Sequence, residues 1–162
     1  MTVSLAPENQ PASQASVFHW PLRVYWEDTD AGGIVFYANY LKYFERARTE
    51  WLRQCGLEQQ ALRKQLAGMF VVSECQLRYL QPARLDDRLD ISVEVIDCGR
   101  VSMLLRQHAY KVGVDQTTEL LCSGTVRLAW VQEQTLRPLR LPAAIVQALG
   151  LAMTSAPDPD CP

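Results

Sequence analysis

One long amphipathic helix constrains this chain more than any other feature of its sequence. Within residues 38–55, apolar side chains recur at the three- and four-residue spacing of a single helix face. They are Tyr40, Leu41, Phe44, Ala47, Trp51, Leu52 and Cys55. Gly56 follows where a C-terminal cap belongs. A stripe this broad must be buried, so the rest of the chain has to supply a surface that covers it.

The remaining segments are mostly typical of β-strands. Apolar and polar residues alternate clearly in two of them, as in strands with one buried face. Strands are predicted at residues 17–26, 70–79, 89–95, 101–112 and 119–131. Shorter helices are predicted at residues 57–66 and 142–149. One long helix followed by a run of antiparallel strands predicts the α+β class, with the sheet wrapped around the helix.

The chain is long enough, at 162 residues, for one domain with a substantial core. It contains neither an internal repeat nor an interdomain linker, so a single domain is predicted over residues 18–150. Residues 1–17 and 151–162 are proline-containing segments and are predicted to be flexible tails. The first 17 residues lack the basic start and apolar middle of a signal peptide, which predicts a cytoplasmic protein.

Composition argues against several functional classes. The net charge is −2 and no basic stripe is present, which argues against general nucleic-acid binding. No apolar run approaches membrane-spanning length. The five cysteines are widely spaced and odd in number, as in a reduced cytoplasmic protein. With His19 and His108 as the two histidines, we predict no metal site and no cofactor.

An acidic, glycine-rich turn leads directly into the long helix. Asp28 and Asp30 precede the Gly32–Gly33 pair, and the helix start that follows carries unpaired N–H groups and partial positive charge. A carboxylate facing such donors is suited to attack on a carbonyl. The turn is not a calcium loop, because Gly32 and Asn39 occupy its fifth and twelfth positions, where oxygen ligands are required. A capping aspartate beside glycines of positive φ is an equally plausible interpretation of the residues alone.

Several blocks of sequence resemble the 4-hydroxybenzoyl-CoA thioesterase family and, within it, the Tol-Pal-associated YbgC-type acyl-CoA thioesterases. The blocks are Asp28-Thr29-Asp30-Ala31-Gly32-Gly33-Ile34-Val35, Tyr37, Asn39-Tyr40, Tyr43-Phe44-Glu45-Arg46-Ala47-Arg48 and Pro82-Ala83-Arg84-Leu85-Asp86-Asp87. The resemblance spans residues 23–149. It implies a hotdog fold, dimers that join their sheets edge to edge, frequent pairing of dimers into tetramers, and substrate channels at the dimer interface.

The resemblance also implies roles for individual residues. Asp30 matches the catalytic aspartate, acting as a base on water or as a nucleophile. The backbone N–H of Tyr37 would polarise the thioester carbonyl, and Gly33 would let the chain pass close to the substrate. Arg100 and Ser102 match a turn that contacts the nucleotide of coenzyme A. A solvated hairpin arginine is the alternative for Arg100, and a brace of the turn is the role expected for Asp28.

The expected activity is hydrolysis of an acyl-CoA thioester to a carboxylic acid and free coenzyme A. One alternative is a hotdog hydratase or dehydratase acting on acyl-CoA or acyl-carrier protein, although such sites generally pair a histidine with an acid and none lies between residues 29 and 62. Another is a non-enzymatic acyl-CoA-binding scaffold. Expected partners are the acyl-CoA substrate and further copies of the chain. An acyl-carrier protein and a membrane-associated complex stay open by resemblance alone.

Two further expectations concern the core. Arg48 falls inside the apolar stripe of the helix, so we predict that it is buried with a carboxylate partner, either Glu45 or the Asp86–Asp87 pair. The cysteines at 55, 75 and 122 fall in apolar or strand-like positions and are predicted to be buried structural thiols.

Overall fold

The computed structural model describes residues 17–151. Its elements, in chain order, are β1 (Phe18–Arg23), the 3-10 helix η1 (Trp26–Asp28), α1 (Asn39–Gln54), α2 (Gln59–Leu66), β2 (Gly68–Tyr79), β3 (Arg88–Cys98), β4 (Ser102–Val112), β5 (Thr118–Gln132) and α3 (Ala143–Ala148). The predicted long helix and all five predicted strands are present, with ends that differ by a few residues. The predicted tails lie almost wholly outside the described residues.

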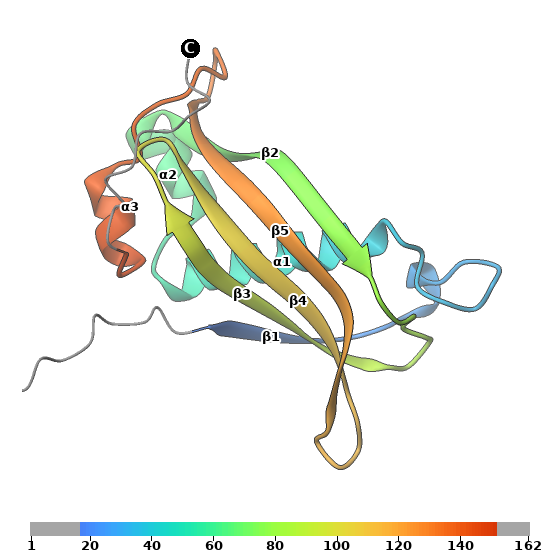
Figure 1. Cartoon of the computed structure of the whole chain (residues 1–162). Helices are drawn as coiled ribbons and strands as arrows, with labels where there is room; N and C mark the ends of the chain where they lie inside the picture. Colours follow the sequence, from blue (N-terminus) through green and yellow to red (C-terminus); the bar gives the residue numbers. More distant parts are fainter. Residues whose placement is uncertain (1–16, 152–162) are drawn as a thin grey trace, which may run out of the picture.

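The five strands form one antiparallel sheet in the order β1-β3-β4-β5-β2. Figure 1 shows α1 lying across one face of this sheet. The register places Leu89, Ile91 and Val93 of β3 on the face toward the helix, where all three are buried. This is the hotdog arrangement, an α+β fold in which the sheet wraps around one long central helix.

The buried face of α1 is rotated slightly about the helix axis relative to the apolar face predicted from the sequence. Leu41 is 42% exposed, whereas Tyr43, which the predicted stripe omits, is 1% exposed. The buried face therefore follows Tyr40, Tyr43, Phe44 and Ala47, the i, i+3, i+4, i+7 pattern that packs on a sheet. The helix lies close to β5, because a Cβ added at Gly124 would meet the Phe44 ring at 3.1 Å.

Arg48 is buried, as predicted, but its partner is not a carboxylate. Its Nη1 donates a 2.8 Å hydrogen bond to Oε1 of Gln107 on β4. The Nε2 of the fully buried Gln107 in turn donates to the carbonyl of Phe44, at 3.1 Å. Burial lowers the pKa of Arg48, and the neighbouring Glu45 acts in the opposite direction. The predicted ion pair is therefore wrong, and an amide bridges the arginine to its own helix.

The cysteines are less uniform than predicted. Cys122 is buried and Cys55 is partly buried, but Cys75 is exposed. Cys75 lies in β2, which is one of the two edge strands of the sheet, pairs only with β5 among the described strands, and has mostly exposed residues over its second half. Within residues 17–151, no helix has the length and apolar character needed to cross a membrane.

Candidate active site

The acidic turn is a compact unit held by its own backbone. The N–H of Asp30 donates to the carbonyl of Ile34 at 2.9 Å, and the N–H of Gly33 donates to the carbonyl of Asp30 at 3.0 Å. A β-bridge between Thr29 and Val35 closes the unit. Gly33 has φ of +73°, a conformation that side-chain-bearing residues rarely adopt. The second glycine of the motif is therefore required by the turn.

The Asp30 side chain is exposed, and only one of its oxygens is held by the turn. The backbone N–H of Gly32 donates to Asp30 Oδ1 at 2.8 Å. A Cβ at Gly32 would lie 3.1 Å from that same oxygen, which is tighter than ordinary contact. The turn thus fixes the carboxylate while leaving its second oxygen free to act on a substrate or a water molecule.

Asp28 has a different role from Asp30. Its side chain is 8% exposed, and its Oδ2 accepts a 2.8 Å hydrogen bond from the N–H of Tyr25. Its carbonyl accepts from the N–H of Phe36 at 2.9 Å and from the side-chain amide of Asn39 at 2.8 Å. Asp28 is therefore a buried brace between the turn and α1, as the sequence suggested.

The start of α1 presents unused donors. Among the described residues, the N–H groups of Tyr37 and Ala38 have no hydrogen-bond acceptor. Both precede the sixteen-residue helix α1, whose N-terminal end carries partial positive charge. The Tyr37 side chain is exposed. Unpaired N–H groups at such a position are suited to hold the oxygen of a polarised carbonyl.

An apolar pocket of about 220 Å³ opens beside Tyr37. Its lining residues are Ile34, Val35, Tyr37, Tyr40, Tyr79, Leu80, Gln81 and Pro82. The hydroxyl of Tyr79 donates to the carbonyl of Tyr37 at 3.1 Å, and the Tyr40 hydroxyl accepts from the N–H of Ala83 at 3.1 Å. Burial raises the pKa of both phenols, so they are neutral structural groups of the pocket wall.

Arg100 and Ser102 lie at the other end of the sheet from the acidic turn. Ser102 pairs with Ala129 of β5, which pairs with Val71 of β2, whereas the pocket lies at Tyr79. At the usual rise per residue in a strand, eight residues of β2 separate these ends by roughly 26 Å. One chain alone thus brings Asp30, Gly33 and Tyr37 together but leaves the predicted nucleotide contacts far from them.

Two contacts near the turn, made by the side chains of Asn39 and Tyr79, were not predicted from the sequence. Asn39 is a polar residue at the start of a helix, which ordinarily indicates a cap, and its bond to Asp28 spans eleven residues. Tyr79 reaches the pocket only because β2 returns to the start of α1, with its ring centroid 6.3 Å from that of Tyr37. A tertiary contact of this kind has no local signature in the sequence.

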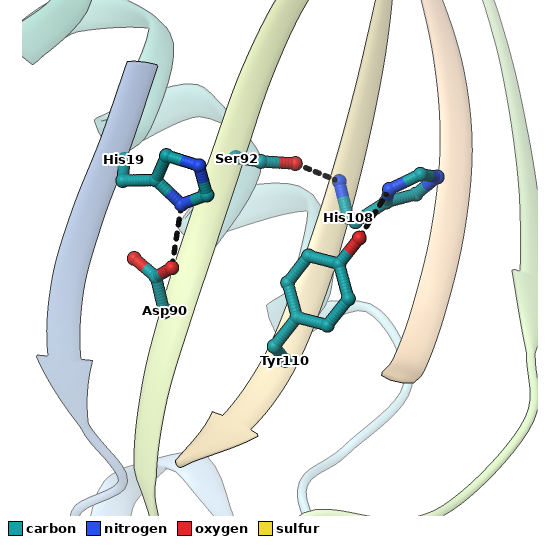
Figure 2. Close-up of polar contacts among 5 residues, drawn as sticks. All are labelled: His19, Asp90, Ser92, His108 and Tyr110. Carbon is teal, nitrogen blue, oxygen red and sulfur yellow. Dashed lines mark hydrogen bonds and ion pairs between the residues drawn. The ribbon is translucent and has the colours of Figure 1, made fainter. Parts of the chain in front are cut away.

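A second polar cluster lies on the sheet face opposite to α1 (Figure 2). Nδ1 of His19 lies 2.6 Å from Oδ2 of Asp90, and Nδ1 of His108 lies 2.9 Å from the hydroxyl of Tyr110. Between them, Ser92 Oγ accepts from the backbone N–H of His108 at 3.1 Å. The serine is engaged with backbone, so the cluster is two separate pairs and not a nucleophile with its base. The described residues contain no group of three or more His, Cys, Asp or Glu side chains placed to hold a metal ion.

The sheet around α1 defines a hotdog-fold protein, and its candidate site combines an exposed carboxylate with unpaired N–H groups, an arrangement suited to carbonyl chemistry. Comparison with known proteins identifies the family to which it belongs. Residues 24–149 match the family described as the thioesterase-like superfamily. The acyl-CoA thioester hydrolase YbgC of Escherichia coli is 40% identical over 131 residues, covering 81% of this chain and 94% of that protein. The acyl-CoA thioesterase YbgC of Helicobacter pylori is 30% identical over 132 residues, covering 79% and 96%.

Solved structures agree with this assignment. A probable thioesterase from Bartonella henselae is 28% identical with a TM-score of 0.72, covering 78% of this chain and 100% of that one. The 4-hydroxybenzoyl-CoA thioesterase of a Pseudomonas species has a TM-score of 0.76 at 19% identity, covering 84% and 99%, which is a likeness in fold. The chain belongs to the thioesterase-like superfamily and is a thioester hydrolase.

Proposed function

We propose that this chain hydrolyses an acyl-CoA thioester to a carboxylic acid and free coenzyme A, with Asp30 as the catalytic carboxylate. The observation that carries this proposal is the placement of the exposed Asp30, held by Gly32 and Gly33, in the turn that delivers the chain to the unpaired N–H groups of α1. Relatives named acyl-CoA thioester hydrolases match over nearly their full length, which supports the substrate class.

The reaction needs few groups. The carbonyl oxygen of the thioester accepts a hydrogen bond from the Tyr37 N–H, a contact worth roughly 3–4 kcal/mol to the transition state. Asp30 either takes a proton from a water molecule whose oxygen attacks the carbonyl carbon, or attacks that carbon itself to form an anhydride that water then opens. In both routes the carbon–sulfur bond breaks and coenzyme A leaves as a thiolate. No strong acid is needed, because a thiol with a pKa of about 8.5 is a good leaving group.

The apolar pocket beside Tyr37 is the site we assign to the acyl group. A group whose carbonyl accepts from the Tyr37 N–H would extend between Tyr40, Tyr79 and Pro82. A cavity of about 150 Å³ holds a benzene-sized molecule, so the volume of about 220 Å³ suits a short or single-ring acyl group.

We further propose that the working enzyme is a homo-oligomer, either a dimer or a tetramer, built through the open edge of β2. Val72, Tyr79 and Leu80 at this edge are exposed, and an open edge with apolar side chains is suited to pair with another strand. Antiparallel pairing of β2 with its copy would bring the start of one β2 against the end of the other. Arg100 and Ser102 of one copy would then approach the acidic turn of the second, where they would bind the nucleotide of coenzyme A.

A cytoplasmic location is proposed from the five widely spaced cysteines, a usage typical of a reducing compartment. An acyl-carrier protein as an alternative acyl donor and a membrane-associated complex as a partner rest on the family resemblance.

Release of free thiol from a panel of acyl-CoA thioesters tests the proposal. We expect hydrolysis of at least one substrate, and a fall in kcat of roughly 10²–10⁴ for Asp30→Asn, the usual contribution of a positioned base. The denaturation midpoint should change little, because Asp30 is exposed. Near-normal turnover by the purified Asn variant would show that another group does the chemistry.

A further inference from the structure

We propose that Asn39 is a positioning residue, whose side-chain amide holds the acidic turn in register with the start of α1. Through this contact it sets the distance between the Asp30 carboxylate and a carbonyl bound at the Tyr37 N–H. The inference rests on the proposed function, since it concerns the alignment of the two groups assigned there.

The contact is buried and direct. Asn39 is the first residue of α1 and is 5% exposed. Its Nδ2 donates to the carbonyl of Asp28 at 2.8 Å, and the same carbonyl accepts from the N–H of Phe36 at 2.9 Å. A single oxygen of the turn therefore carries one bond from the helix side chain and one from the segment that enters the helix.

The amide is not used to build the helix itself. An asparagine at a helix start ordinarily accepts a hydrogen bond from a backbone N–H of the first turn. In this structure no side chain caps the start of α1, and the Asn39 amide donates outward to the turn. Loss of the amide therefore removes the side-chain link between α1 and the turn, while the Phe36 N–H bond to the Asp28 carbonyl and the backbone bonds within each unit remain.

Because the turn is braced internally, we expect it to shift as one piece when this link is lost. Its internal bonds join Asp30 to Ile34 and Gly33 to Asp30, and its return arm is held by the N–H of Val35 on the carbonyl of Ala83. The hydroxyl of the buried Tyr43 lies near the Asp28 carboxylate but makes no aligned hydrogen bond there, so it does not replace the amide. A shift of the whole turn by about 1 Å would cost on the order of 10² in rate.

The test is a double-mutant cycle between Asn39 and Asp30, measured by thiol release with the acyl-CoA that the wild type hydrolyses fastest. Asn39→Ala should lower kcat by about 10- to 100-fold and change KM by less than about threefold, because the contact aligns reacting groups and does not bind substrate. In the Asp30→Asn background the same substitution should change kcat by less than about twofold, since nothing is left to align.

Ser92→Ala is the matched control. It also removes one buried side-chain bond to backbone, on the sheet face away from α1 (Figure 2), and should keep wild-type kcat. Asn39→Ser retains a hydrogen-bond donor, so its kcat should lie between those of Asn39→Ala and the wild type. If Asn39→Ala does not fold, the double-mutant cycle with Asp30→Asn is measured with Asn39→Ser instead.

The positioning role would be overturned if the Asn39 variants kept wild-type kcat. It would also be overturned if they lost kcat by the same factor in the wild-type and Asp30→Asn backgrounds. The Asp30→Asn single variant reports on the proposed function separately, because its own loss of turnover does not depend on Asn39.

Discussion

At the scale of single residues, two glycines share the same backbone conformation, and substituting each in turn distinguishes an effect on stability from an effect on catalysis. Gly33 has φ of +73° and Gly56 has φ of +76°, and a Cβ added at either would meet no atom within 4 Å. Alanine in this conformation costs about 1–2 kcal/mol. Gly33→Ala and Gly56→Ala should therefore lose similar stability in urea melts, but only Gly33→Ala should lose kcat in the thiol-release assay, because only Gly33 shapes the turn that carries Asp30. Equal kcat in the two variants would count against that role for the turn.

Arg48 allows a second test at this scale. Arg48→Met leaves the buried Oε1 of Gln107 without its donor, and an unsatisfied buried polar group costs about 1–3 kcal/mol. Adding Gln107→Leu removes that acceptor and should recover part of the loss. Arg53→Ala on the exposed side of the same helix is the control, and its free energy of unfolding should change by less than about 0.5 kcal/mol. A shift for Arg48→Met as small as that of the control would mean that the buried network contributes little to stability.

At the scale of elements, strand β4 carries a titrating group on its outer face. Burial, followed by the neighbouring Arg106, lowers the pKa of His108 below its ordinary 6.5, while Glu94 acts in the opposite direction. The unfolded chain then binds the proton more tightly than the folded one, so the free energy of unfolding falls as pH drops below 6.5. In urea melts, the free energy of unfolding of His108→Gln should fall less than that of the wild type between about pH 7 and about pH 5. Tyr110→Phe, which keeps the imidazole, should retain most of the wild-type slope. An unchanged slope in the Gln variant would contradict the prediction.

The elements were largely predictable from local patterns, and their contacts were not. Helical spacing predicted a helix at 38–55, close to the observed Asn39–Gln54. Alternation clearly indicated two of the strands, β2 and β3, although the bulge between Val72 and Glu74 interrupts it in β2. The partner of Arg48 lies 59 residues away on β4, and a neutral amide gives no charge pattern to follow. The acidic turn was recognisable because its glycines and carboxylates are adjacent in sequence, whereas the Asn39 link and the pocket at Tyr79 form only in the folded chain.

At the scale of the whole molecule, the open edge of β2 predicts how the chain assembles. Val72 is 50% exposed on this edge, and a lysine there should prevent pairing with another strand. Val72→Lys should therefore sediment as a monomer at micromolar concentration and lose activity. Val114→Lys makes the same change at a fully exposed hairpin position, with 100% exposure, and should keep both the oligomer and the activity. A wild-type protein that is monomeric and fully active would rule out an interfacial site.

Assembly through β2 also predicts that each site is shared between two copies, with Asp30 from one and Arg100 from the other. Arg100→Ala should raise KM for a full acyl-CoA and spare kcat, because a phosphate contact binds the ground state and transition state alike. It should have no effect on a pantetheine thioester that lacks the nucleotide. An equal penalty on both substrates would rule out phosphate binding.

Mixed oligomers then decide between shared and separate sites. When Asp30→Asn and Arg100→Ala chains are unfolded together and refolded, a shared arrangement creates one site with Asp30 from the Arg100→Ala chain and Arg100 from the Asp30→Asn chain. That site has neither substitution, so a component with wild-type KM should appear that neither parent shows. If each site is built within one chain, every active site in the mixture lacks Arg100, and KM should stay at the raised value of the Arg100→Ala parent.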